Sequence, residues 1–261
     1  MALATGMAGR RKTALLVSLV GVASVATLAI TAGGWRAPVL PEGGNRAGKL
    51  AELRVLAQAG RDADALATLH QLAQGGSADA ERTLGQVLLA RGDSRDALVW
   101  LQRAGSAGDA EANATMGKAY LLGQDGVRQD YAQARPALQA GADRGHAGAA
   151  YYLGLLYRNG YGVPADTAAA AHWFRVAASQ QSAAAQFMLA NAYRNGDGVP
   201  QSNERALALY RESAELEYPP ASQALAMAYQ NGEMGLQPDP VSYRQQLAET
   251  AHAMKHPAQQ P

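Results

Sequence analysis

The side chains best suited to chemistry in this 261-residue sequence are its five histidines, and their spacing does not build a catalytic site. Only His252 and His256 stand four residues apart, which places two metal ligands on one helix face, and Glu249 lies on a compatible face. The His-Glu-x-x-His pattern of zinc hydrolases does not occur in the sequence. We interpret the pair as a solvated helix end and predict no catalytic residue, no metal ligand and no cofactor.

Two other features of the sequence resemble sites by composition. Gly160-Tyr161-Gly162 is rich in glycine, but a nucleotide loop follows a strand and opens a helix beside a basic or hydroxyl ligand. Here the glycines follow a predicted helix and recur along the chain, which predicts structural turns. His146, which follows Gly145, is predicted to have a structural role at a helix end.

The sequence consists largely of repeats, and their secondary-structure elements must position any functional site. Four tyrosines recur at spacings of 37, 36 and 36 residues, and small residues, glycines and apolar residues return in the same order around each one. A period of this length is typical of stacked helical hairpins. We predict an all-α, right-handed α-solenoid of about six helix-turn-helix repeats. The predicted hairpins cover 47–78, 79–110, 111–147, 148–183, 184–220 and 221–257.

The best-preserved copy shows how a unit folds. Small and apolar residues at helical spacing, among them Gly154, predict a first helix that a neighbouring helix approaches closely. Gly160 ends that helix, and Asp166 caps the next one, as Asp130 and Ser202 do in their own units. Pro136 inside a second helix is expected to cost a hydrogen bond. Three side chains are assigned to the core by their regularity: Tyr157, Tyr193 and Tyr229.

The pattern Leu-Gly-x-x-Tyr-x-x-Gly-x-Gly-Val-x-x-Asp, which runs from Leu153 to Asp166 and is followed by Ala170 and Trp173-Phe174, resembles the Sel1-like repeat. This repeat is a longer relative of the tetratricopeptide repeat, and the resemblance covers most of 79–257. It implies a protein that binds partners through the concave face of its solenoid.

The N-terminus is a second feature of the sequence. Arg10-Arg11-Lys12 precede an uncharged apolar run over 13–34, which is about the 20 residues that a membrane-spanning helix needs. The positive-inside rule predicts a cytoplasmic segment 1–12, a signal-anchor 13–34, a linker 35–46, the repeat solenoid 47–257 in the periplasm and a polar tail 258–261. Cleavage as a signal peptide is the alternative, and it would give a secreted or soluble periplasmic protein.

Composition narrows the classes of partner. Beyond residue 12 the sequence has 20 basic and 22 acidic residues, a balance that gives no electrostatic footprint for nucleic acid. The sequence has no cysteine, so lipid attachment at a processed cysteine and structural disulfides are both excluded. The expected partner is a protein or a polysaccharide.

The resemblance to tetratricopeptide arrays implies which side chains face a partner: those three residues before, and one and four after, the small residue of the Leu-Gly pair. An aromatic residue beside an arginine in two neighbouring units suits an extended segment with an apolar side chain and an acidic group. The alternative is that the two aromatic rings pack between helices and the arginines are solvated helix ends. The six positions are Tyr151, Leu155, Arg158, Phe187, Asn191 and Arg194.

These observations predict a non-enzymatic scaffold or adaptor, anchored in a bacterial inner membrane by a single helix. By resemblance, its setting is an envelope assembly, such as exopolysaccharide export, a pilus or secretion machinery, or a signalling role. Two alternatives stay open: a secreted repeat protein, and an enzyme that acts on cell-wall fragments or β-lactams.

Overall fold

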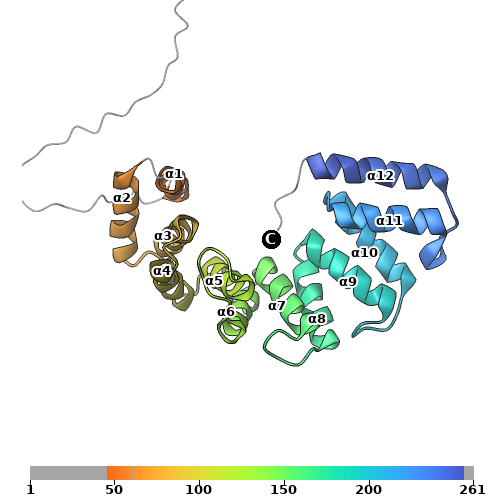
Figure 1. The fold of residues 1–261 in the computed structure, drawn as a ribbon, viewed down its shortest axis with the longest axis horizontal. Helices are drawn as coiled ribbons and strands as arrows, with labels where there is room; N and C mark the ends of the chain where they lie inside the picture. The colour runs from red at the N-terminus through yellow and green to blue at the C-terminus, as the bar shows by residue number, and fades with distance from the viewer. Residues whose placement is uncertain (1–45, 60–61, 256–261) are drawn as a thin grey trace, which may run out of the picture. The chain divides into compact units, whose positions relative to one another are not determined.

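The computed structural model describes residues 46–59 and 62–255, and in these ranges the chain forms twelve α-helices, one 3-10 turn and no strand (Figure 1). The predicted fold class, an all-helical solenoid, is confirmed, whereas its right-handed winding stays a prediction. The helices are α1 (Arg46–Gln58), α2 (Ala63–Gln74), α3 (Ala78–Arg91), α4 (Ser94–Ser106), α5 (Ala110–Leu122), α6 (Tyr131–Asp143), α7 (Ala147–Asn159), α8 (Thr167–Ala178), α9 (Ala183–Asn195), α10 (Asn203–Glu215), α11 (Pro219–Asn231) and α12 (Pro240–Lys255).

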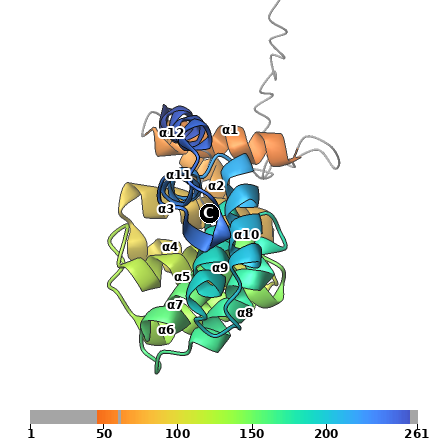
Figure 2. The same ribbon diagram turned by 90° about the vertical axis from the view of Figure 1, so that its right-hand side faces the viewer.

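Consecutive helices pair into six hairpins, as predicted, from α1 with α2 to α11 with α12. Each hairpin packs against the next one along the chain, and Figure 1 shows them in chain order. Figure 2 shows the same helices turned by 90°. Contacts also join α1 to α3, α3 to α5 and α5 to α7. The first helices from α1 to α7 therefore contact one another in succession. Side chains continue this row, because Arg158 of α7 reaches Met188 of α9 and Phe187 of α9 lies beside Tyr218, just before α11. We call the six first helices the odd-helix layer.

Small residues allow the two helices of a hairpin to approach closely. A Cβ atom on Gly154 would lie 2.6 Å from a ring carbon of Phe174, and one on Gly117 would lie 2.7 Å from Cγ of Leu138. Gly85 holds the same position against Leu101 in α3 and α4. The predicted close approach of the first helix is confirmed.

The caps of the second helices also follow the sequence pattern. Asp130, Asp166 and Ser202 each accept a hydrogen bond from a backbone amide in the first turn of the helix that follows. Gly160, at φ 69°, ends α7 in the left-handed conformation that glycine adopts most readily. Pro136 lies inside α6, which continues through it from Tyr131 to Asp143.

The glycine loop of each longer unit packs onto the preceding hairpin. Gly198, at φ 70°, lies against the backbone of Thr167 and Ala168 at the start of α8. One unit earlier, a Cβ atom on Gly162 would lie 2.6 Å from Cβ of Tyr131 at the start of α6. These loops are therefore contacts between hairpins as well as turns within them.

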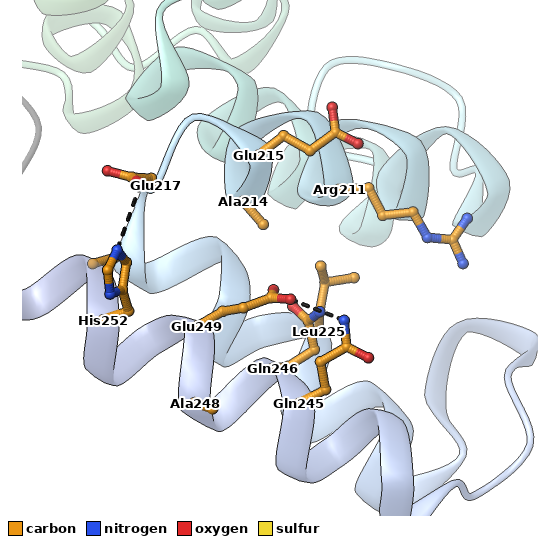
Figure 3. A pocket seen from close by; sticks show the side chains of 11 residues that line it. Arg211, Ala214, Glu215, Glu217, Leu225, Gln245, Gln246, Ala248, Glu249 and His252 are labelled. Carbon is orange, nitrogen blue, oxygen red and sulfur yellow. Dashed lines mark hydrogen bonds and ion pairs between the residues drawn. The ribbon is translucent and has the colours of Figure 1, made fainter.

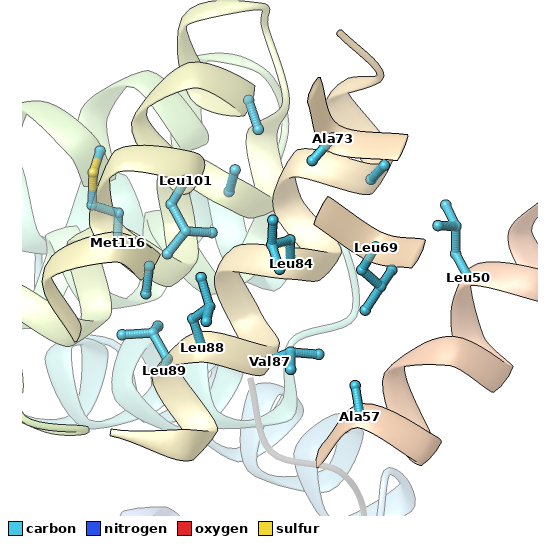
Figure 4. Packing of buried hydrophobic residues seen from close by; sticks show 14 of the residues in the cluster. Leu50, Ala57, Leu69, Ala73, Leu84, Val87, Leu88, Leu89, Leu101 and Met116 are labelled. Carbon is cyan, nitrogen blue, oxygen red and sulfur yellow. The ribbon is translucent and has the colours of Figure 1, made fainter. Parts of the chain in front are cut away.

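The core consists of leucines and alanines that repeat with the hairpins. In the N-terminal part, Leu69 of α2, Leu84 of α3 and Leu101 of α4 are fully buried and meet between the helices (Figure 4). Leu153 of α7 and Tyr210 of α10 are equally buried further along the chain. Burial of such side chains is the main force that holds the hairpins together.

One prediction about the core needs correction. Tyr193 is buried, as expected, but Tyr157 and Tyr229 are only partly buried. Tyr157 packs against the core from its edge. A tyrosine ring at such a position buries its apolar body and leaves its hydroxyl near water, so regular spacing did not require full burial.

The predicted cytoplasmic segment 1–12, membrane segment 13–34 and tail 258–261 lie outside the described residues, as does nearly all of the linker 35–46. Among the residues that the structure does describe, no helix is both long enough and apolar enough to cross a bilayer.

Candidate functional site

The odd-helix layer contains two adjacent hollows, each built from three successive hairpins. The first has a volume of about 420 Å³ and is lined by α1, α3 and α5. The second, of about 280 Å³, is lined mainly by α3, α5 and α7 and by the loop after α5. Glu111 of α5 contributes to both hollows. No single hairpin could form either one.

Two ion pairs fix the position of Arg82 in the first hollow. Nη1 of Arg82 donates to Oδ2 of Asp109 at 2.6 Å, and Nη2 donates to Oδ1 of Asp79 at 3.0 Å. The Asp109 side chain also caps α5, because it accepts from the amide of Ala112. The ion pairs thus join α3 to the start of α5 and fix the position of the arginine.

A histidine and a glutamate join the third and fourth hairpins. Nδ1 of His146 accepts from the amide of Ala149 at 3.0 Å and so caps α7, while Nε2 lies 2.8 Å from Oε2 of Glu111. The hydrogen bond from His146 is the main reason that the pKa of Glu111 lies below its ordinary value. The predicted structural role of His146 at a helix end is confirmed.

In the second hollow a cation lies over an aromatic ring. Nζ of Lys118 is 5.2 Å from the ring centroid of Tyr152 on α7, within the range of cation–π attraction. This side of the layer therefore combines an aromatic face with groups that donate and accept hydrogen bonds.

The six predicted partner-binding residues all lie in the odd-helix layer, three on α7 and three on α9. Tyr151 and Phe187 are partly buried. The ring centroid of Tyr151 is 6.1 Å from that of Phe174, and the centroid of Phe187 is 5.7 Å from that of Tyr210. The rings therefore pack between helices, as the alternative stated, while part of each remains exposed. Leu155 is likewise partly buried.

Two polar members of the set contact side chains on neighbouring helices. Oδ1 of Asn191 accepts from the hydroxyl of Tyr210 at 2.6 Å. The exposed Arg158 reaches from α7 to α9, where its Nη1 lies 3.0 Å from Sδ of Met188. Arg194 is partly exposed, and its charge lowers the pKa of Tyr210 against the larger effect of burial, which raises it.

Tyr218 extends this part of the layer and was not predicted. Its ring centroid lies 5.6 Å from that of Phe187, and it stands just before α11. Burial raises the pKa of Tyr151 to about 12, and the nearby hydroxyl groups of Tyr218 and Tyr152 add to the rise. We call the set Tyr151, Arg158, Phe187, Asn191, Arg194 and Tyr218 the aromatic–arginine surface.

A third hollow, of about 530 Å³, lies between α10 and α12 (Figure 3). His252 is on its edge, with Nε2 4.0 Å from Oε1 of Glu217, and Glu249 accepts from Gln245 at 3.0 Å. The predicted partner of His252, His256, lies outside the described residues. Within the described part of the chain, no group of three or more metal-ligating side chains is assembled.

The comparisons with known proteins settle the family. A family model described as Sel1 repeat matches residues 84–109, 110–146, 147–182, 183–218 and 219–242, which is more than half of the chain. The chain belongs to the Sel1 repeat family. The matched segments correspond to the second through fifth hairpins and to the first helix of the sixth. The first hairpin, α1 with α2, extends the array beyond the matched Sel1 repeats.

Solved structures show the same fold. A Sel1 repeat protein from Oxalobacter formigenes is 26% identical, with a TM-score of 0.69 over 80% of this chain and 89% of the other. A protective antigen of uropathogenic Escherichia coli is 24% identical, with a TM-score of 0.55 over 79% of this chain and 54% of the antigen. An immunity protein from Pseudomonas aeruginosa, 18% identical, shares the fold with a TM-score of 0.55 over 85% and 86% of the two chains. No curated protein matches significantly.

An alignment of the Sel1 repeats indicates the site residues that the sequence analysis did not predict. The spacing rule, applied to Gly85, points to Arg82 and Gln86, both of which line the first hollow. Tyr218 stands 36 residues after Ser182, which itself stands 36 after His146, and all three precede a first helix. An alignment of every repeat, including the shorter second one, would have predicted these positions.

Proposed function

We propose that this Sel1 repeat protein is an adaptor that binds an extended segment of a partner protein along its odd-helix layer. The observation that carries the proposal is the pair of adjacent hollows, because each collects side chains from three hairpins and both share Glu111. An extended partner could contact several repeats at once, which is how solenoids gain binding surface. Sel1 repeat proteins are generally protein–protein interaction scaffolds and typically not enzymes.

We also propose that segment 13–34 anchors the protein in the inner membrane and that the repeats lie in the periplasm, as part of an envelope assembly. Support comes from the sequence: basic residues at 10–12, the apolar run and the short linker before α1. Release of the repeats after signal-peptide cleavage is the competing arrangement, and it leaves the binding surface unchanged.

The test is site-specific photo-crosslinking of the full-length protein in cells. A crosslinking residue replaces Gln86 or Thr115, which line the hollows, and a matched variant carries it at the exposed Gln133 on α6. We expect discrete adducts with the same protein from the first two positions and none from the third. Adducts from Gln133 alone, or from no position, would contradict the proposal.

Mass spectrometry of the protein's own N-terminus in the same samples decides the location. An intact N-terminus in the membrane fraction is expected for an anchored adaptor. A processed N-terminus with protein in the medium would instead assign the binding function to a secreted protein.

A further inference from the structure

The aromatic–arginine surface differs in charge from the rest of the odd-helix layer. Helices α7, α9 and α11 contain no aspartate or glutamate. By contrast, α3 carries Asp79 and Glu81, and α5 carries Glu111. Half of the layer is therefore free of acidic side chains along three successive hairpins.

Two arginines in this half lack a carboxylate partner. Arg82 and Arg91 on α3 both form ion pairs, whereas neither Arg158 nor Arg194 is within ion-pair distance of a carboxylate in residues 46–59 and 62–255. The two residues stand at equivalent positions of the repeat, on adjacent odd helices. Because arginine pairs with carboxylates in a planar, bidentate way, two such groups favour an acidic ligand.

The carboxylates nearest these helices in sequence are occupied by local contacts. Asp197, after α9, accepts from Nδ2 of Asn195 at 3.2 Å, and Glu233, after α11, accepts from Nδ2 of Asn231 at 2.9 Å. Glu217, before α11, lies 4.0 Å from His252. These groups reduce the positive potential at the ends of the helices but do not neutralise the arginines directly.

Apolar and polar groups beside the arginines complete the surface. The partly exposed rings of Phe187 and Tyr218 offer an apolar face. The hydroxyl of Tyr210 fixes Asn191 through Oδ1, which leaves the amide nitrogen of Asn191 to donate to a ligand. A backbone carbonyl of an extended peptide is a suitable acceptor for that donor.

From this arrangement we propose that the aromatic–arginine surface binds an acidic segment of the partner, in which two carboxylates flank an apolar side chain. The inference rests on the proposed adaptor function and specifies its ligand. The carboxylates bind Arg158 and Arg194, and the apolar side chain rests on Phe187 and Tyr218.

The test uses a random 12-residue peptide display library, selected on the full-length protein. We expect enriched peptides with at least two acidic residues around an apolar one. Arg158→Gln and Arg194→Gln should each weaken binding of the best peptide about tenfold or more, since hydrogen bonds to charged groups are among the stronger ones. Added salt should weaken it further. Arg135→Gln, at an exposed site on α6, is the matched control and should leave binding unchanged.

The outcomes separate this inference from the adaptor proposal. The inference would be overturned if the library enriched neutral or basic peptides, or if the acidic peptides bound both arginine variants at full strength. In either case, crosslinks from Gln86 would still support the adaptor proposal. A third outcome is that the protein binds polygalacturonate, that both arginine variants abolish this binding, and that no acidic peptides are enriched. This outcome would assign the surface to an acidic polysaccharide and would also overturn the inference. Unchanged helical circular dichroism shows that the arginine variants remain folded.

Discussion

Substitution of Gly198 by alanine tests whether the glycine loops hold successive hairpins together. The residue has φ 70°, and an added Cβ would overlap the carbonyl group of Thr167 and lie 2.5 Å from the amide nitrogen of Ala168. The left-handed conformation costs about 1–2 kcal/mol for an alanine. Displacement of the backbone at α8 adds about 1–3 kcal/mol, the usual cost of overpacking. We therefore expect a loss of about 2–5 kcal/mol.

Gly145 provides the matched control. It has φ 83°, and an added Cβ would meet no heavy atom within 4 Å, so Gly145→Ala carries the conformational cost without the overlap. The expected loss for this variant is about 1–2 kcal/mol. The difference between the two variants isolates the contact between the loop and α8.

Thermal unfolding followed by circular dichroism at 222 nm measures both variants. For a domain of this size, 1 kcal/mol corresponds to about 2–4 °C in Tm. Gly198→Ala should therefore unfold at least about 2 °C below Gly145→Ala. Equal losses would refute the reasoning, because they would show that the loop does not rest on the backbone of the preceding hairpin.

Three further changes have expected results. Asp166→Ala removes the cap of α8 and should cost about 1 kcal/mol in urea unfolding, with Asp166→Asn close to the wild type. Leu153→Ala opens a cavity at a fully buried site and should cost about 2–5 kcal/mol, and a smaller loss than from Asp166→Ala would contradict the core assignment. The pKa of Glu111 is lowered in the fold, mainly by the hydrogen bond from His146, so its stabilisation is present above the ordinary value of 4.5 and is lost as pH falls through the lowered pKa. Glu111→Gln should therefore flatten the loss of stability in urea unfolding between about pH 5 and pH 3.

The hairpins could be predicted from the sequence because the residues that begin, end and pack the helices lie within each repeat. Gly160 must end a helix, Asp166 must begin one, and Gly154 must lie where two helices meet, and these constraints involve only neighbouring residues. Tyr157 was assigned too deep a position because its spacing is shared by core residues and by rings at the edge of the core. Spacing alone does not distinguish the two cases.

The candidate site could be predicted only in part. The rule for ligand-facing positions selected residues on the odd helices, and the structure shows that Tyr151 and Phe187 use part of their surface for packing. The hollows depend on side chains that converge from three hairpins, as Arg54, Gln86 and Glu111 do. Convergence of this kind is set by the angle between hairpins, which no single repeat encodes.

The two halves of the odd-helix layer differ in the side-chain pairs that position their groups, and this difference should govern how they respond to pH. Side-chain pairs position the hollows, notably Arg82 with Asp109 and Glu111 with His146. Glycine loops contact the preceding hairpin in both halves, Gly126 at the backbone of Gly92 and Gly198 at the backbone of Thr167, and these contacts involve no charged side chain. Protonation of carboxylates weakens the first kind of contact and leaves the second intact. The acid-free half of the layer should therefore keep its geometry at a pH at which the hollows loosen.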